Sequence, residues 1–322
     1  MELRTFATVL AALMTGLLPL AGMAQQYPDR PIRLLLGVAA GGGQDTIARA
    51  MAPKVSNILG ANIVMDNRPG AGGDIAMGVA MQASPDGYTL LMISSSNVIR
   101  PLMYKTPYLP QRDFAPIAQL INQPYLLVTP YALPAKSVTD LIAYAKSNPG
   151  KLNFGSAGNG TLTHLAAELF KDQAQIEAVH VPYKGAGALY PDLIAGRVQF
   201  SFSTIASALI HVRTNRLRAL AVSSPKRVAS IPDIATVAES GLPGYAVSQW
   251  YAVLAPKGVS QKIIEKVNKA LVTVLHDPEL ARHLAADGAD AASSSPAELA
   301  IHLKLENERW GRIIKKTGLL KE

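Results

Sequence analysis

Two glycine-rich segments of the chain have residue types and spacing suited to holding a small anion. Gly41-Gly42-Gly43-Gln44-Asp45 follows an apolar run and precedes a helical pattern, and the segment from Ser156 to Thr163 repeats this order. Glycine lets the backbone approach a ligand closely, and the unpaired N–H groups at the start of a helix lie at the positive end of its dipole. Facing each other, the two segments would hold a carboxylate without a charged side chain. The alternative is that both are turns that need a left-handed residue.

Polar residues near these segments extend the candidate site. Arg100 comes just after Ser94-Ser95-Ser96-Asn97, and a guanidinium suits a second carboxylate because it donates two parallel hydrogen bonds. An ordinary exposed arginine is the alternative. His164 follows the second segment, where it either contacts the ligand or is a hydrogen-bonded structural residue. Core packing is expected for Trp250 and Tyr251, with cleft lining as the alternative.

The motifs of common enzyme classes are incomplete in this sequence. Ser156 comes closest to a serine nucleophile elbow, but Phe154 stands where G-x-S-x-G needs its first glycine. No histidine is followed by glutamate, so H-E-x-x-H is absent, and neither a Walker loop nor G-x-G-x-x-G is completed. The sequence contains no cysteine, which excludes thiolate ligands and a Cys nucleophile. We therefore expect a binding protein with no catalytic residue, metal or cofactor, and an exported enzyme is the less favoured alternative.

The elements that must position these residues alternate between apolar runs and helical patterns, which is typical of α/β structure with largely parallel sheets. The first set of expected strands comprises Ile32–Val38, Asn62–Met65 and Tyr88–Ile93. The later ones are Tyr125–Val128, Asn153–Gly155, Glu177–Val181, Val198–Phe202, Leu217–Val222 and a strand within Tyr245–Leu254. Ligands of such folds bind at the carboxyl ends of strands. One predicted cleft therefore includes Gly41–Gly43, Ser94–Asn97, Gly155–Thr161 and Phe202–Thr204.

The first residues predict export. Arg4 precedes an apolar run from Phe6 to Leu20, and Gly22-Met23-Ala24 supplies the small residues that a signal peptidase recognises. We expect a signal peptide over residues 1–24, cleavage before Gln25 and a periplasmic location. An uncleaved anchor is the alternative, but the run is short against the roughly 20 residues that span a bilayer. Without a cysteine to lipidate, the mature protein is expected to be unanchored, and we expect a monomer.

The net charge of +8 is spread along the chain. The longest basic runs are pairs such as Lys226-Arg227 and Lys315-Lys316, whereas nucleic-acid binding favours clustered basic residues. We therefore expect no nucleic-acid partner. A mild positive field would favour small anions, and a merely solvated basic surface is the alternative.

Nine motifs in order make the chain resemble the tripartite tricarboxylate transporter receptor family, also called Bug proteins. The resemblance runs from Tyr27 to about Gly318. The motifs are Tyr27-Pro28 with Pro31-Ile32-Arg33, Ala40-Gly41-Gly42-Gly43-Gln44-Asp45, Asn67-Arg68-Pro69-Gly70-Ala71-Gly72-Gly73, Pro85-Asp86-Gly87-Tyr88-Thr89-Leu90, Asn148-Pro149-Gly150-Lys151-Leu152-Asn153, Gly158-Asn159-Gly160-Thr161, Val181-Pro182-Tyr183-Lys184-Gly185, Leu217-Arg218-Ala219-Leu220-Ala221-Val222 and Gly241-Leu242-Pro243-Gly244-Tyr245.

The resemblance implies an α/β type II periplasmic binding protein, with two Rossmann-like lobes around a hinged ligand cleft. Lobe 1 is expected over residues 25–123, lobe 2 over 124–244, and a returning part of lobe 1 over 245–322. Such proteins close on a small carboxylate and pass it to membrane permease subunits of a tripartite tricarboxylate transporter. A binding protein that feeds a sensor kinase would use the same closure and stays open as an alternative.

The resemblance also implies ligand loops at residues 38–45, 94–97 and 156–163, at Tyr183 and in the Phe202-Ser203-Thr204 turn. With Arg100 and His164 added, the predicted ligand-binding residues are Val38, Ala40, Gly41, Gly42, Gly43, Asp45, Ser94, Ser95, Ser96, Asn97, Arg100, Ser156, Gly158, Asn159, Thr161, Thr163, His164, Tyr183, Ser203 and Thr204.

Three departures from the family pattern concern the ligand. Gly37-Val38-Ala39 stands where relatives often carry Pro-Phe-Pro, which predicts a roomier pocket. Ser203-Thr204 stands where some relatives have an aspartate that meets an amino group, and Arg100-Pro101 replaces a common Asn-Pro. The hypothesis is therefore a dicarboxylate without an amino group, aliphatic or aromatic.

Overall fold

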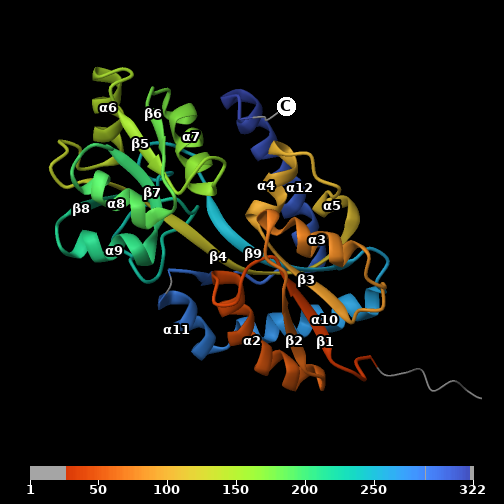
Figure 1. The fold of residues 1–322 in the computed structure, drawn as a ribbon. Coiled ribbons are helices and arrows are strands. Elements are labelled where there is room, and N and C mark those ends of the chain that lie inside the picture. Colours follow the sequence, from red (N-terminus) through yellow and green to blue (C-terminus); the bar gives the residue numbers. More distant parts are fainter. Residues whose placement is uncertain (1–26, 287, 320–322) are drawn as a thin grey trace, which may run out of the picture.

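Two sheet regions that share one long strand form the centre of the molecule (Figure 1). The structure is a computed structural model that describes residues 27–286 and 288–319, so the predicted signal peptide lies outside the described residues. The first region contains β2 (Ile63–Asn67), β1 (Ile32–Leu36), β3 (Thr89–Ser94), β9 (Ser248–Pro256), the first part of β4 (Phe114–Pro130) and β10 (Asp290–Ala291). The second contains the rest of β4 with β7 (Phe200–Thr204), β5 (Asn153–Ser156), β6 (Val179–Pro182) and β8 (Leu217–Val222).

Both regions are built on the same parallel plan. β1 pairs parallel with β2 and β3, and β5 pairs parallel with β6 and β7. Helices cover the faces of these strands, which explains the apolar run of β1, where four of five residues are buried. Antiparallel strands join the two plans, because β9 pairs with β3 and β4, and β4 pairs with β7 and β8.

β4 is much longer than the expected strand Tyr125–Val128. Its residues from Phe114 to Pro124 pair with β9, and those from Tyr125 onward pair with β7 and β8. The chain therefore passes from one sheet region to the other along a continuous strand, and it returns where β9 begins at Ser248, opposite Pro124. These two strand crossings join the two lobes that are visible in Figure 1.

Helices pack on both sheet regions. In the first lobe they are α2 (Gly43–Leu59), the short η2 (Ala71–Gly73), α3 (Asp74–Met81), α4 (Ser95–Met103), α5 (Pro110–Asp113), α10 (Gln261–Leu275) and α11 (Pro278–Ala286). In the second lobe they are α6 (Val138–Ser147), α7 (Leu162–Ala174), α8 (Ala186–Ile194) and α9 (Ile205–Arg213). Among the described helices, none combines the length and apolarity that a bilayer crossing requires.

The last helix, α12 (Pro296–Thr317), contacts both lobes (Figure 1). Leu299 and Leu303 belong to an apolar core of the first lobe, whereas Trp310 and Ile314 belong to the main core of the second. A capping box formed by Ser295 and Glu298 begins the helix by satisfying its first amides. The returning segment therefore packs against both lobes.

Two segments expected as irregular are regular in the structure. Ser95-Ser96-Asn97 is the first turn of α4 rather than a loop, since Asn97 Oδ1 accepts a hydrogen bond from the Ser94 amide at 2.9 Å. This reciprocal cap explains how a serine-rich stretch begins a helix. Phe202-Ser203-Thr204 forms the end of β7 rather than a turn, because β4 pairs with it.

Candidate ligand-binding site

A pocket of about 340 Å³ lies where β1 and β3 end and β9 begins. Its lining residues are Gly37, Val38, Gly43, Gln44, Gly72, Gly73, Ser94, Ser96, Asn97, Gln249 and Tyr251. Among these described residues none carries a charged side chain, and several carry amides or hydroxyls. The pocket is thus a neutral, polar concavity at the carboxyl ends of parallel strands, where ligands bind in α/β folds.

Glycines make room for the polar side chains of this pocket. A Cβ atom on Gly43 would lie 2.9 Å from the Tyr251 hydroxyl oxygen, and one on Gly73 would lie 2.7 Å from Asn97 Nδ2. Gly73 also has a φ of +100°, a conformation that other residues rarely adopt. The glycine motifs therefore let two polar side chains approach the backbone at the pocket.

Open hydrogen-bond donors gather at the start of α2. The side chain of Gln44 is buried, with 3% of the residue exposed, and its Nε2 has no hydrogen-bond partner in the described part of the chain. Gly42 provides no side-chain cap for the first amides of the helix. A buried unpaired donor costs about 1–3 kcal/mol. A ligand oxygen in this pocket would remove that cost and would also meet the positive end of the helix.

Asp45 fastens the loop that precedes α2. Its buried carboxylate accepts hydrogen bonds from the Gly41 amide at 2.8 Å, from Arg49 Nε at 2.8 Å and from Asn67 Nδ2 at 3.0 Å. The hydrogen bond from Arg49 is the main reason that the pKa of Asp45 falls to about 2. Asp45 does not line the pocket, so its geometry fits bracing of the loop better than the predicted ligand contact. Ala40 and Gly41 lie exposed on the same loop.

The second glycine-rich segment differs from the first in its hydrogen bonds. Three of its amides already have acceptors: Ala157 N donates to Thr163 Oγ1, Gly158 N to Ser156 Oγ and Gly160 N to His164 Nδ1, each at 3.1 Å. Thr161 caps α7 by accepting from the His164 amide. Contrary to the expectation from sequence, these three amides are not open donors. Asn159 is exposed at the tip of the loop.

The other predicted residues occupy varied positions. Arg100 Nε donates to Asp74 Oδ1 at 2.7 Å, and the Tyr183 hydroxyl donates to Asp192 at 2.8 Å, so both side chains have partners within their own lobe. His164 is 3% exposed, as the structural alternative requires. Ser203 is buried, and its Oγ lacks a hydrogen-bond partner among the described residues. Thr204 shares a hydrogen bond with the Ser207 hydroxyl at 2.6 Å.

The pocket therefore combines part of the predicted set with residues that were not selected. Of the predicted residues it brings together Val38, Gly43, Ser94, Ser96 and Asn97, all of the first lobe. Ser95 lies next to it, since its Oγ donates to Gln249 Oε1 at 2.9 Å. The lining residues outside the predicted set are Gly37, Gln44, Gly72, Gly73, Gln249 and Tyr251, although Gln44 lies within the predicted loop at 38–45. For Tyr251 the cleft-lining alternative holds, whereas Trp250 is a core residue that is 1% exposed.

The described residues hold no group of three or more His, Asp or Glu side chains arranged for a metal ion.

Comparison with known proteins gives consistent matches. The model of the tripartite tricarboxylate transporter family receptor matches residues 47–319. Protein BugT of Bordetella pertussis is 35% identical over 298 residues, which cover 92% of this chain and 91% of BugT.

Solved structures agree with these matches. The structure described as R. palustris Rpa4515 with adipate is 33% identical, with a TM-score of 0.73 and coverage of 91% of this chain and 98% of that one. MatC of Rhodopseudomonas palustris with bound malate is 29% identical, with a TM-score of 0.70 and coverage of 89% and 100%. The predicted two-lobed α/β fold of a periplasmic binding protein is confirmed, and the chain belongs to the tripartite tricarboxylate transporter receptor family of solute-binding proteins.

Proposed function

We propose that this protein captures a small dicarboxylate without an amino group and delivers it to the membrane permease subunits of a tripartite tricarboxylate transporter. The observation that carries the proposal is the buried Gln44 amide, whose Nε2 lacks a partner among the described residues in a pocket with no charged lining side chain. Carboxylate oxygens accept hydrogen bonds from such a donor and from the first amides of α2.

The absence of an acidic group among the described lining residues favours ligands without an amino group. An ammonium group needs acceptors, and a buried ammonium needs a counter-charge. The nearby carboxylate of Asp45 is engaged with Gly41, Arg49 and Asn67. Ser203, whose buried Oγ lacks a hydrogen-bond partner among the described residues, adds a hydroxyl and no charge to the second lobe. The adipate and malate bound by two similar proteins are dicarboxylates without an amino group, which supports the same ligand class here.

The two lobes give the capture step its mechanism. The first lobe offers the open donors, and the second lobe closes over the ligand and shifts the population toward a closed form. We place the lobes at residues 25–123 and 124–244, with 245–322 returning to the first. The pairing of Pro124 with Ser248, followed by that of Tyr125 with Thr204, supports the boundary in β4. The closed form is what the permease subunits recognise.

The proposal also covers the location and the assembly of the protein. A signal peptide over residues 1–24 exports the protein to the periplasm, and the mature chain is an unanchored monomer. It changes no covalent bond of its ligand and uses no metal or cofactor. The net charge of +8 supports the attraction of a dianion over a distance.

Thermal shifts on residues 25–322 test this function. The panel contains mono-, di- and tricarboxylates, aromatic acids and amino acids. A ligand that binds only the folded state stabilises it by about 2.7 kcal/mol at a concentration of 100 times its Kd. We expect a selective rise in Tm with one dicarboxylate class. Larger shifts with aspartate or glutamate than with every non-amino dicarboxylate, or no shift with any acid, would refute the proposal.

A further inference from the structure

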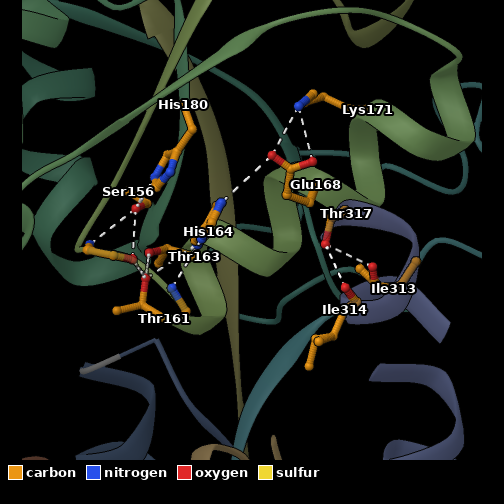
Figure 2. Close-up of polar contacts among 12 residues, drawn as sticks. Ser156, Thr161, Thr163, His164, Glu168, Lys171, His180, Ile313, Ile314 and Thr317 are labelled. Carbon is orange, nitrogen blue, oxygen red and sulfur yellow. Dashed lines mark hydrogen bonds and ion pairs between the residues drawn. The ribbon is translucent and has the colours of Figure 1, made fainter. Parts of the chain in front are cut away.

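Two histidine rings stack behind the second glycine-rich segment (Figure 2). His180 of β6 and His164 of α7 have ring centroids 3.7 Å apart and planes tilted by 11°. The ring of Phe154 on β5 stacks on His180 with a centroid distance of 4.8 Å. His180 is thus held between two elements of the second lobe, at the base of the loop that joins β5 to α7.

His180 contacts that loop through Ser156. The distance from His180 Nε2 to Ser156 Oγ is 2.7 Å, and Ser156 is fully buried. Ser156 Oγ also accepts from the Gly158 amide at 3.1 Å and lies 3.0 Å from the Gly158 carbonyl oxygen. A hydroxyl donates only one hydrogen bond. Ser156 Oγ therefore donates to His180 Nε2 when that nitrogen carries no proton, and it donates to the Gly158 carbonyl oxygen when Nε2 is itself the donor. The protonation state and the tautomer of His180 together therefore set the direction of the hydrogen bonds inside the loop.

Charged side chains of α7 lie beside the two stacked histidine rings. His164 Nε2 lies 3.7 Å from Glu168 Oε1, and Lys171 Nζ lies 3.0 Å from the same carboxylate (Figure 2). From α12, Lys316 pairs with Asp172 rather than with the histidines. Burial, together with the neighbouring His164, lowers the pKa of His180 to about 4. His180 is therefore neutral at the pH of most growth media.

We infer that His180 is a positioning residue for ligand binding, which holds Ser156 and so fixes the shape of the loop from Ser156 to Thr161. This inference rests on the proposed function, in which the second lobe closes over a carboxylate. It assigns a role to a side chain that lies outside the predicted site. Tyr183 N donates to Ser156 O at 3.1 Å and Gly185 N donates to Ala157 O at 3.2 Å, so the loop after β6 moves with the same unit.

Four variants separate the hydrogen bond from the stacking. His180→Phe keeps an aromatic ring and loses the bond, His180→Gln keeps an amide that can reach Ser156, and Ser156→Ala removes the partner. His276→Gln, at an exposed histidine that follows α10, is the matched control. Hydrogen exchange of the 157–161 amides in the ligand-free protein is measured first. We expect exchange about five- to tenfold faster in His180→Phe and Ser156→Ala, the size of one lost hydrogen bond.

Calorimetric titration with adipate and with malate then gives the Kd. We expect about tenfold weaker binding in His180→Phe and in Ser156→Ala, and near-normal binding in His180→Gln. A double variant that combines His180→Phe with Ser156→Ala should show no further loss. As the pH falls from 7 to 4, the Kd of the wild type should rise relative to that of His180→Gln, and this ratio cancels the titration of the ligand itself.

The two parts of the experiment separate the two claims. Unchanged loop exchange in His180→Phe, or a pH ratio that stays constant, would overturn the role of His180. If loop exchange is faster in His180→Phe but the wild type binds no dicarboxylate, the role of His180 in the loop stands and the proposed function is refuted.

Discussion

The two glycine-rich loops of this protein have the same plan but different hydrogen bonding. The first loop, before α2, is braced from below by Asp45 and leaves Gln44 Nε2 without a partner in the described residues. The second loop, before α7, uses Ser156, Thr163 and His164 to satisfy three of its own amides. In both loops a side chain in the first turn of the following helix accepts from a loop amide, as Asp45 does from Gly41 N. The loops differ because Thr161 caps α7, whereas Gly42 gives α2 no side-chain cap and Gln44 Nε2 has no partner in the described residues. Glycine spacing alone does not decide this difference.

This difference suits the two lobes to different roles in ligand binding. In the proposed function, the open donors of the first lobe bind the carboxylate before closure, and the second loop keeps its shape through its own hydrogen bonds. The comparison predicts that changes in the first loop alter affinity through its donors. Changes in the second loop should alter affinity by making the backbone of that loop less ordered.

Removing the brace of the first loop should have the largest effect. Asp45→Ala removes the acceptor of Gly41 N and one acceptor each of Arg49 and Asn67. We expect a loss of about 3 kcal/mol in the free energy of unfolding, and weaker ligand binding than in the wild type. Urea unfolding measures it, and Asp233→Ala, at an exposed aspartate, is the control. A loss no greater than that of the control would show that the brace is unimportant.

Low pH should remove the stability that the Asp45 carboxylate contributes. The folded pKa of Asp45, about 2, lies below its ordinary value of 3.8, so this carboxylate stabilises the fold above pH 4. That contribution is lost as the pH falls from about 4 to 2, and Asp45→Asn should lose less stability over this window than the wild type.

In the second lobe, His180 should make stability depend on pH in a higher window. Its folded pKa of about 4 is below the ordinary 6.5, so the unfolded chain binds more protons between these values and stability falls as the pH drops through them. The full shift would correspond to roughly 3 kcal/mol at 1.36 kcal/mol per unit, and we expect a smaller loss because solvent screens this half-buried ring. Urea unfolding at several pH values measures it. If His180→Gln lost as much stability from pH 6.5 to 4 as the wild type, another group would be responsible.

Gln44→Met should separate affinity from stability. The variant removes an unpaired buried donor, so we expect unchanged or slightly higher Tm together with ligand binding weaker by about 10- to 30-fold. Gln82→Met, at an exposed glutamine after α3, controls for the change in side-chain chemistry. Calorimetry and thermal unfolding provide the two readouts. A lower Tm with unaltered Kd would mean that Gln44 serves the fold and not the ligand.

Gly43→Ala should have the smallest effect. The new methyl group would lie 2.9 Å from the Tyr251 hydroxyl and displace it, and we expect a few-fold rise in Kd, about 1 kcal/mol. Gly78→Ala is the matched control, because a Cβ there meets no atom within 4 Å. Equal Kd values for the two variants would exclude a role for the close approach of Tyr251.

Much of the fold could be predicted because its strands are apolar and end in glycine-rich turns. β4 was one exception, since Pro116, Gln119 and Asn122 interrupt its pattern. The structure accommodates them with irregular registers after Pro116 and Gln119 and with a hydrogen bond between the side chains of Gln119 and Asn122. Such compensation depends on the partner strand, so the local sequence does not contain it.

The site was predicted in part for a related reason. Val38, Gly43 and Ser94 follow strand ends and could be selected from the pattern. Gln249 and Tyr251 reach the pocket from β9, more than 150 residues later, and only the pairing of β9 with β3 brings them there. Gln44 belongs to a motif that was selected, but the sequence does not show that its side chain is buried beside a neutral pocket.

The most direct test of ligand capture is calorimetric titration of residues 25–322 with acids matched in carbon skeleton. Succinate is compared with aspartate, and glutarate with glutamate, so each pair differs only in the amino group. The neutral pocket predicts that the non-amino acid of at least one pair binds, and that it binds more tightly than its amino partner. Tighter binding of aspartate or glutamate would contradict the account of the pocket.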